Sequence, residues 1–154
     1  MLAWHYTTGR KFQHIRSSGM LIPGGIEVEP TGTRVLWFSR NQHWEPTAGD
    51  ECHEAGQPLR RLTMRETYMA SGGLVRYGCD LKRLYVGEVL RRKARMTHEF
   101  WATLHAAGKL QQAYPGAWCG SVESIPIDGL VVHVMSESFK WQRLEACQRI
   151  IGIE

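Results

Sequence analysis

The sequence predicts an α+β fold with a split, mostly antiparallel β-sheet and flanking helices. Segments with strand character are short and outnumber the long helical segments, and the two kinds are irregularly mixed along the chain. The 154 residues match the usual size of one domain, and 43% of them are hydrophobic, which is enough for a core. We therefore expect a single domain over residues 1–154.

Five segments have the alternation, or the β-branched and aromatic content, that is typical of strands. They are 2–7, 34–39, 73–81, 121–127 and 129–135. In the first of them Trp4 and Tyr6 face one side of the sheet, so that His5 faces the other. Residues 23–33 and 44–58 are rich in turn-forming residues and are predicted as loops.

Helical segments show apolar residues spaced near four or seven apart, with a glycine where each helix would end. The longest covers 87–107 and would end at Gly108. Its apolar stripe runs through Val89, Met96 and Phe100. The other predicted helices are a short one from Phe12 to a stop at Gly19, one over 59–70 that stops at Gly72, and a C-terminal one around Leu144, Cys147 and Ile151.

The formal net charge of +4 is mild, but the cations are unevenly distributed. Six of them lie within residues 82–95, on the long predicted helix and just before it. A basic helical face of this kind contacts phosphates in some proteins and is an ordinary solvated surface in others. The charge pattern therefore leaves a nucleic-acid partner open.

The four cysteines are widely spaced, form no C-x-x-C pair and have no partners at zinc-ligand spacing. We therefore expect free thiols and no bound metal. The N-terminus becomes polar within a few residues and lacks the apolar segment of a signal peptide. No stretch approaches the roughly 18 apolar residues of a membrane span. These features predict a cytoplasmic protein.

Four short motifs occur in order along the chain, and each alone has an ordinary structural explanation. They are Trp4-His5-Tyr6-Thr7-Thr8, Ser18-Gly19-Met20-Leu21-Ile22-Pro23, Val35-Leu36-Trp37-Phe38-Ser39 and Glu123-Ser124-Ile125-Pro126-Ile127. Taken together, the ordered set resembles the ADP-ribosyltransferase fold, in the branch related to diphtheria toxin with a His-Tyr-Glu site. The last motif is also similar to that of bacterial toxins that ADP-ribosylate DNA.

The resemblance implies an enzyme that uses NAD as a substrate. Such an enzyme cleaves the bond between nicotinamide and ribose and transfers ADP-ribose to a macromolecular acceptor such as a nucleic acid, as a toxin or as a phage or defence effector. The transition state is oxocarbenium-like, with positive charge on the ribose. The site therefore needs a hydrogen-bonding group on the ribose, an aromatic wall for nicotinamide and a carboxylate near the developing cation.

The resemblance assigns these roles to particular residues. Glu123 and His5 would be catalytic: Glu123 would stabilise the cation and activate the acceptor, and His5 would bind the ribose. Either Tyr6 or Trp37 would stack on nicotinamide. Ser39 would orient Glu123 or the nicotinamide ribose. The residues assigned to NAD binding are His5, Tyr6, Thr7, Trp37 and Ser39.

The chain also departs from known branches of this fold. Relatives that modify arginine carry two acids as E-x-E, whereas Ser121 stands at the earlier position here, which argues against arginine as the acceptor. The Ser-Thr-Ser motif of another branch is replaced by W-F-S. Protein, DNA, RNA and a small molecule all stay open as acceptors.

Two other function classes compete with the transferase. One is a non-catalytic nucleic-acid-binding module that uses the basic helix 87–107. The other is a metal-dependent nuclease or hydrolase built on His5, His43 and His53, which is disfavoured because these histidines are scattered along the chain and no D-x-D pair accompanies them. Turnover of NAD would separate the transferase from both.

Overall fold

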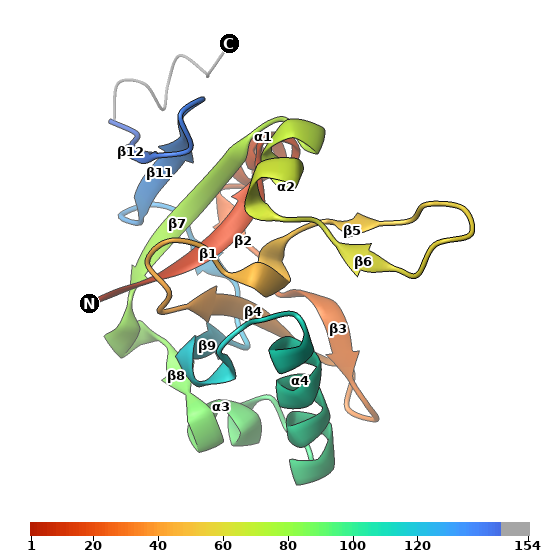
Figure 1. The fold of residues 1–154 in the computed structure, drawn as a ribbon. Helices are drawn as coiled ribbons and strands as arrows, with labels where there is room; N and C mark the ends of the chain where they lie inside the picture. Colours follow the sequence, from red (N-terminus) through yellow and green to blue (C-terminus); the bar gives the residue numbers. More distant parts are fainter. Residues whose placement is uncertain (146–154) are drawn as a thin grey trace.

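A computed structural model describes residues 1–145 and shows an α+β fold around one large sheet (Figure 1). The eight strands of this sheet are β1 (Leu2–Thr8), β3 (Gly24–Val28), β4 (Thr33–Ser39), β7 (Leu74–Asp80), β8 (Tyr85–Val86), β9 (Trp118–Ser121), β11 (Val131–Met135) and β12 (Trp141–Arg143). They run in the order β12-β11-β7-β1-β4-β9-β8, and β3 pairs with β4 outside this path. Every pairing among these strands is antiparallel, as expected.

The sheet is split between β1 and β4, which are neighbours near its centre. Strands β1 and β7 pair over seven positions, from Leu2 opposite Asp80 to Thr8 opposite Leu74. By contrast, β1 and β4 share the single register pair Trp4–Ser39. The two halves of the sheet therefore meet at one point and separate beyond it, and this separation positions the site described below.

Four helices and two small sheets accompany the large sheet. The helices are α1 (Gly9–Ser18), α2 (Met64–Ala70), α3 (Gly87–Lys93) and α4 (His98–Leu110). The small sheets pair β2 (Met20–Leu21) with β10 (Ile125–Pro126), and β5 (Glu51–Cys52) with β6 (Arg60–Arg61). Helices α1 and α2 lie beside the half that contains β1 and β7, and α3 and α4 lie beside the half that contains β8 and β9 (Figure 1). Three 3-10 turns complete the order: η1 (Pro46–Ala48), η2 (Leu81–Arg83) and η3 (Pro115–Ala117).

Helix α1 follows directly from β1 and carries part of the core. Thr8 ends the strand in extended geometry, and its side chain accepts a hydrogen bond from the Lys11 backbone. Gly19 ends the helix in the left-handed conformation (φ 70°), as the sequence predicted. Phe12 buries its ring against Tyr77 of β7, in the larger of two apolar clusters.

The long helix predicted over 87–107 is wrong, because the chain forms α3 and α4 instead. Arg95 has a positive φ of 58°, and Thr97 then caps α4 by accepting a hydrogen bond from the Phe100 backbone. Gly108 lies inside α4 and does not end it. Val89 of the predicted stripe is exposed, whereas Leu90 is buried in the smaller apolar cluster, against Val35 of the sheet.

Three other predictions need correction. The predicted loop 23–33 contains β3, and the predicted helix 59–70 begins only at Met64, after β6. A capping box between Thr63 and Glu66 sets that start. The predicted strand 121–127 is interrupted, since β9 ends at Ser121 and β10 covers two residues.

The predicted C-terminal helix falls mostly outside the described residues, which include Leu144 but neither Cys147 nor Ile151. Leu144 is buried in the larger core cluster. Within residues 1–145 no helix has both the length and the apolar character needed to cross a membrane.

Candidate functional site

A cleft of about 560 Å³ lies where β1 and β4 separate. It is lined by residues of both strands, of the first turn of α1, of β3 and β6, of the segment 45–51, of the second half of α4 and its cap Gln111, and by Trp118 at the start of β9. Cofactor and small-molecule sites typically enclose about 300–1,000 Å³. The split in the sheet therefore creates a cavity whose size is typical of cofactor and small-molecule sites.

The side chain of His5 on β1 reaches across the split to β4. Its Nδ1 lies 2.8 Å from the backbone carbonyl oxygen of Trp37. A carbonyl only accepts, so Nδ1 carries the proton, and Nε2 of the neutral ring is left as an acceptor. Burial lowers the pKa of His5, the hydrogen bond to Trp37 opposes this, and the charge of Lys11 lowers it further. His5 is therefore a neutral hydrogen-bond acceptor on the cleft wall.

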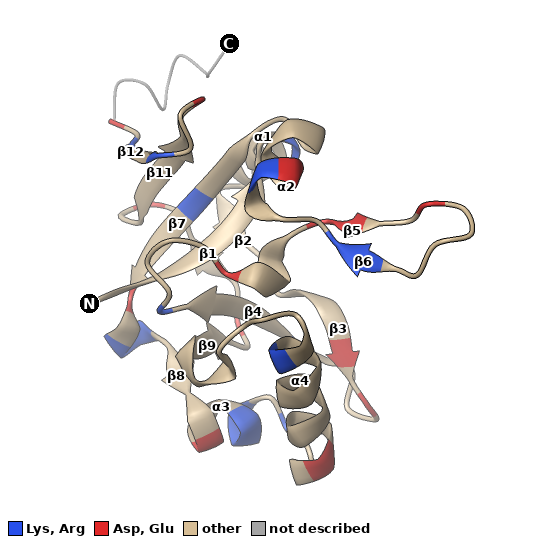
Figure 2. Cartoon of the chain, viewed as in Figure 1, with Lys and Arg blue, Asp and Glu red and all other residues tan. Residues whose placement is uncertain are grey.

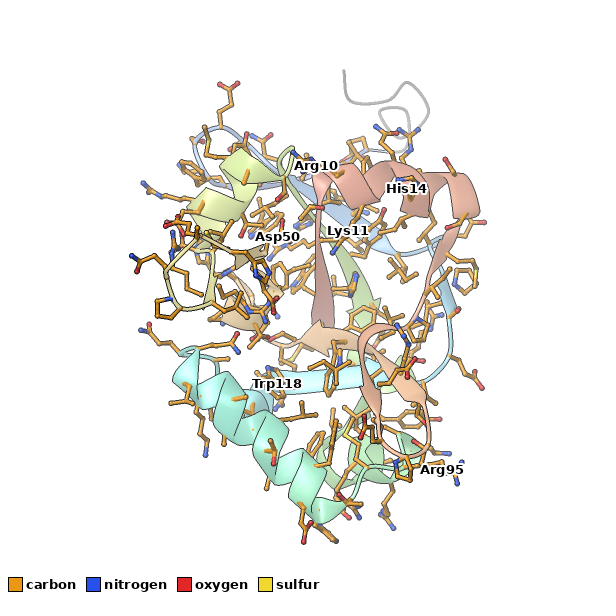
Figure 3. All side chains as sticks on the ribbon, turned by 90° about the vertical axis from the view of Figure 1, so that its right-hand side faces the viewer. Arg10, Lys11, His14, Asp50, Arg95 and Trp118 are labelled. Carbon is orange, nitrogen blue, oxygen red and sulfur yellow. The ribbon has the colours of Figure 1, made fainter. Side chains whose placement is uncertain are left out.

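Trp37 and Trp118 form an aromatic floor. Their ring centroids lie 5.7 Å apart at 66°, in an edge-to-face arrangement, and both side chains are partly exposed to the cleft. Gly108 of α4 allows this packing, because a Cβ atom there would lie 2.5 Å from the Trp118 ring. Figure 3 shows Trp118 on one side of the site and Lys11 and Asp50 on the other.

The remaining residues predicted to bind NAD have different environments. Tyr6 lines the cleft but is 8% exposed, and its ring packs against Trp44 and Trp141. Ser39 also lines the cleft, and its hydroxyl accepts a hydrogen bond from the Asn41 backbone at 3.1 Å. Thr7 is buried and is not part of the cleft wall. The structure thus brings His5, Tyr6, Trp37 and Ser39 together, but not Thr7.

Glu123 lies outside the cleft. It is exposed, in a bend between β9 and β10, and its backbone NH and carbonyl both bond to the Ser121 hydroxyl. Strand β9 meets the cleft at Trp118, which pairs with Ser39, whereas Ser121 at the other end pairs with Leu36. Glu123 follows the Ser121 end of β9, and it is not among the residues that line the cleft.

Charged residues that the sequence did not single out line the cleft. Lys11 enters from α1, and Glu45, Asp50 and Glu51 enter from the segment after β4. The acidic β5 and basic β6 lie side by side (Figure 2), and Glu51 pairs with Arg61 at 3.2 Å. The signal that could have found Glu45 is its position between Trp44 and Pro46, in a segment that the sequence analysis predicted as a loop.

A buried arginine holds the segment after β4 in place. Arg76 of β7 is 6% exposed, and its guanidinium lies 3.8 Å from the Trp4 ring centroid and 4.6 Å from that of Trp141. Its Nη1 donates to the Gln42 carbonyl at 2.6 Å. Burial, followed by the charge of Arg76, lowers the pKa of the adjacent His133 to about 4. This cluster ties the loop to the sheet.

The thiols and histidines form no alternative centre in the described part of the chain. Cys52, Cys79 and Cys119 are free thiols, as expected, and Cys147 lies outside the described residues. Among residues 1–145 no three His, Cys, Asp or Glu side chains are grouped so that they could hold a metal ion.

No family model, curated protein or solved structure matches the chain.

Proposed function

We propose that the protein is an NAD-dependent ADP-ribosyltransferase with a macromolecular acceptor. One observation carries this proposal: a neutral His5 lies beside Trp37 in a cleft formed by a split antiparallel sheet. The ordered motifs of the sequence supply the two strands that form this split. The ADP-ribosyltransferase type of fold is part of the same proposal.

The chemistry follows from the residues of the cleft. Nε2 of His5 accepts a hydrogen bond from a ribose hydroxyl, and the Trp37 ring faces the nicotinamide. Lys11 is an exposed cation on the wall of the cleft and attracts the diphosphate. These contacts fix the ribose before the reaction, which lowers the entropic part of the barrier.

In the reaction the bond between ribose C1′ and the nicotinamide nitrogen breaks, and its electron pair stays on the nitrogen. The nicotinamide, which is cationic while bonded, leaves as a neutral molecule, and C1′ takes the positive charge. An acceptor oxygen or nitrogen then forms a bond to C1′ and releases a proton. Electrostatic stabilisation of this cation is the main task of the protein.

Two measurements test the proposal. NAD at about 100 times its dissociation constant should stabilise the protein by about 2.7 kcal/mol, which a melting curve detects. Incubation with labelled NAD and a lysate, followed by nuclease or protease digestion, should show which class of molecule carries the label. A protein that does not respond to millimolar NAD but responds to other nucleotides would contradict the proposal.

A second candidate function is nucleic-acid binding through α3 and the residues next to it. Arg92, Lys93 and Arg95 are exposed there, and no carboxylate of residues 1–145 lies within ion-pair distance of them. Arg91 is different, because it pairs with Glu88 at 2.5 Å. Helix α3 does not line the cleft, so the two functions use separate surfaces.

A further inference from the structure

Glu45 is a buried carboxylate on the wall of the cleft. It is 7% exposed, and its Oε1 accepts hydrogen bonds from the Thr47 hydroxyl at 2.8 Å and the Thr47 backbone at 3.3 Å. No Lys, Arg or His of residues 1–145 forms an ion pair with it. A buried carboxylate without a cationic partner is unfavourable for folding, and such groups are concentrated at functional sites.

The segment that carries Glu45 is firmly held. Four hydrogen bonds connect the three residues before Trp44 to the sheet: Tyr6 Oη to the Asn41 carbonyl (2.6 Å), Trp4 Nε1 to Gln42 Oε1 (2.8 Å), Arg76 Nη1 to the Gln42 carbonyl (2.6 Å) and Trp141 Nε1 to the His43 carbonyl (2.7 Å). Trp44 itself packs edge-to-face on Tyr6, with ring centroids 5.2 Å apart. Burial is the main cause that raises the pKa of Tyr6 to about 12, and the charge of Glu45 makes a smaller contribution in the same direction. The carboxylate is therefore positioned in advance, as electrostatic catalysis requires.

The other carboxylates fit this role less well. Glu51 is already neutralised by Arg61. Asp50 is less buried and accepts a hydrogen bond from the hydroxyl of Ser71, at the end of α2. Glu123 is exposed and is not among the residues that line the cleft.

We infer that Glu45, rather than Glu123, is the catalytic carboxylate that stabilises the positive charge on the ribose. The inference rests on the proposed function. In the bound substrate the charge lies on the nicotinamide ring, and as the C1′–N bond breaks it moves to the ribose. Glu45 supplies a negative charge that forms no ion pair within residues 1–145, in the cleft that His5 also lines. The same carboxylate is available to take the proton that the acceptor releases.

The test compares Glu45→Gln with Glu123→Gln and with Glu137→Gln, an exposed acid outside the cleft. Glutamine keeps the oxygen that accepts from Thr47, so the cap of the 46–48 turn is preserved while the charge is lost. Nicotinamide release from NAD, in the presence of a lysate that becomes labelled, measures turnover. The NAD-induced rise in melting temperature measures binding separately.

We expect Glu45→Gln to lower turnover by about a hundredfold while the NAD-induced shift is retained, because one preorganised electrostatic partner is lost in the transition state. Glu123→Gln and Glu137→Gln should stay within about twofold of the wild type. If Glu45→Gln does not fold, Glu45→Asp, which keeps the charge but withdraws it by one methylene, should still lower turnover by about tenfold.

Two results would overturn the assignment: near-normal turnover in the folded Glu45 variants, or a loss in Glu123→Gln as large as that in Glu45→Gln. A wild-type protein that neither binds nor consumes NAD would instead overturn the proposed function. The two failures are therefore distinguishable.

Discussion

The Nδ1 atom of His5 lies 2.8 Å from the carbonyl oxygen of Trp37, across the point where β1 and β4 separate. A regular sheet would place a backbone hydrogen bond here. The imidazole takes its place, and in doing so it fixes its own tautomer and leaves Nε2 as an acceptor on the cleft wall. One side chain thus closes the split and prepares the site.

His5→Ala should therefore affect stability and binding together. The carbonyl of Trp37 loses its partner, which costs about 1–3 kcal/mol of unfolding free energy. NAD binding should weaken at least about tenfold, because the ribose loses a hydrogen bond in a buried site. Urea unfolding and NAD titration measure the two effects. His14→Ala is the matched control, since His14 is exposed on α1; equal effects in both variants would show that His5 has no special role.

Strands β1, β4, β7 and β11 could be predicted from the sequence because their residue pattern is local. The break between α3 and α4 could not, since the apolar pattern continues through Met96, and the break depends on Thr97 acting as a cap and on Met96 being buried. Helix periodicity does not reveal which of several possible caps a chain uses.

The candidate site was likewise only partly predictable from the sequence. His5, Trp37 and Ser39 lie in short motifs on two strands, and they do line one cleft. Glu45 was not found because its burial depends on partners far away in the sequence, such as Trp141, which bonds to His43 across 98 positions. Glu123 was placed on a strand, whereas β9 ends at Ser121; the resemblance implied a catalytic role for Glu123, which our inference assigns to Glu45 instead.

Gly108 provides a prediction about the floor of the cleft. A methyl group at this position would lie 2.5 Å from the Trp118 ring, which also packs on Trp37 and His105. Gly108→Ala should lower the free energy of unfolding by about 1–3 kcal/mol through overpacking, although alanine favours a helix by about 1 kcal/mol. Urea unfolding measures the change.

Ala106→Gly is the control for Gly108→Ala, because Ala106 is exposed on the same helix. The free energy of unfolding of Ala106→Gly should be about 1 kcal/mol below that of the wild type, because glycine has a lower helix propensity than alanine. A Gly108→Ala protein that is more stable than the wild type would show that α4 does not pack on Trp118 as described.

The lowered pKa of His133 leads to a prediction about how the stability of the protein depends on pH. Its folded pKa of about 4 lies below the ordinary value of 6.5, so the unfolded chain takes up a proton that the folded protein excludes. Its contribution is fully present above about pH 6.5 and is lost as pH falls toward 4. In His133→Gln the amide oxygen still accepts from Arg76 but does not titrate. Between about pH 7 and pH 4.5, the free energy of unfolding of the variant should therefore fall by about 1–2 kcal/mol less than that of the wild type.

Urea unfolding at the two pH values tests the role of His133. Burial also lowers the pKa values of His5 and His105, so both proteins should lose stability in acid, and only the difference between them is informative. His43→Gln is a suitable control because His43 is exposed. Parallel losses in the wild type and His133→Gln would contradict the prediction.

The last prediction concerns the basic surface at α3, where Figure 2 shows cations near the end of the helix. Arg91 is 12% exposed and donates to Glu88 and to the Met96 carbonyl, so Arg91→Gln should mainly lower the melting temperature. Arg92 and Arg95 are exposed. If they contact phosphates, replacing both with glutamine should lower the affinity for a labelled duplex and reduce the slope of log affinity against log salt by about 2. If the wild type does not bind the duplex at about 50 mM salt, or if the double variant binds it as well as the wild type, then α3 is an ordinary solvated helix face.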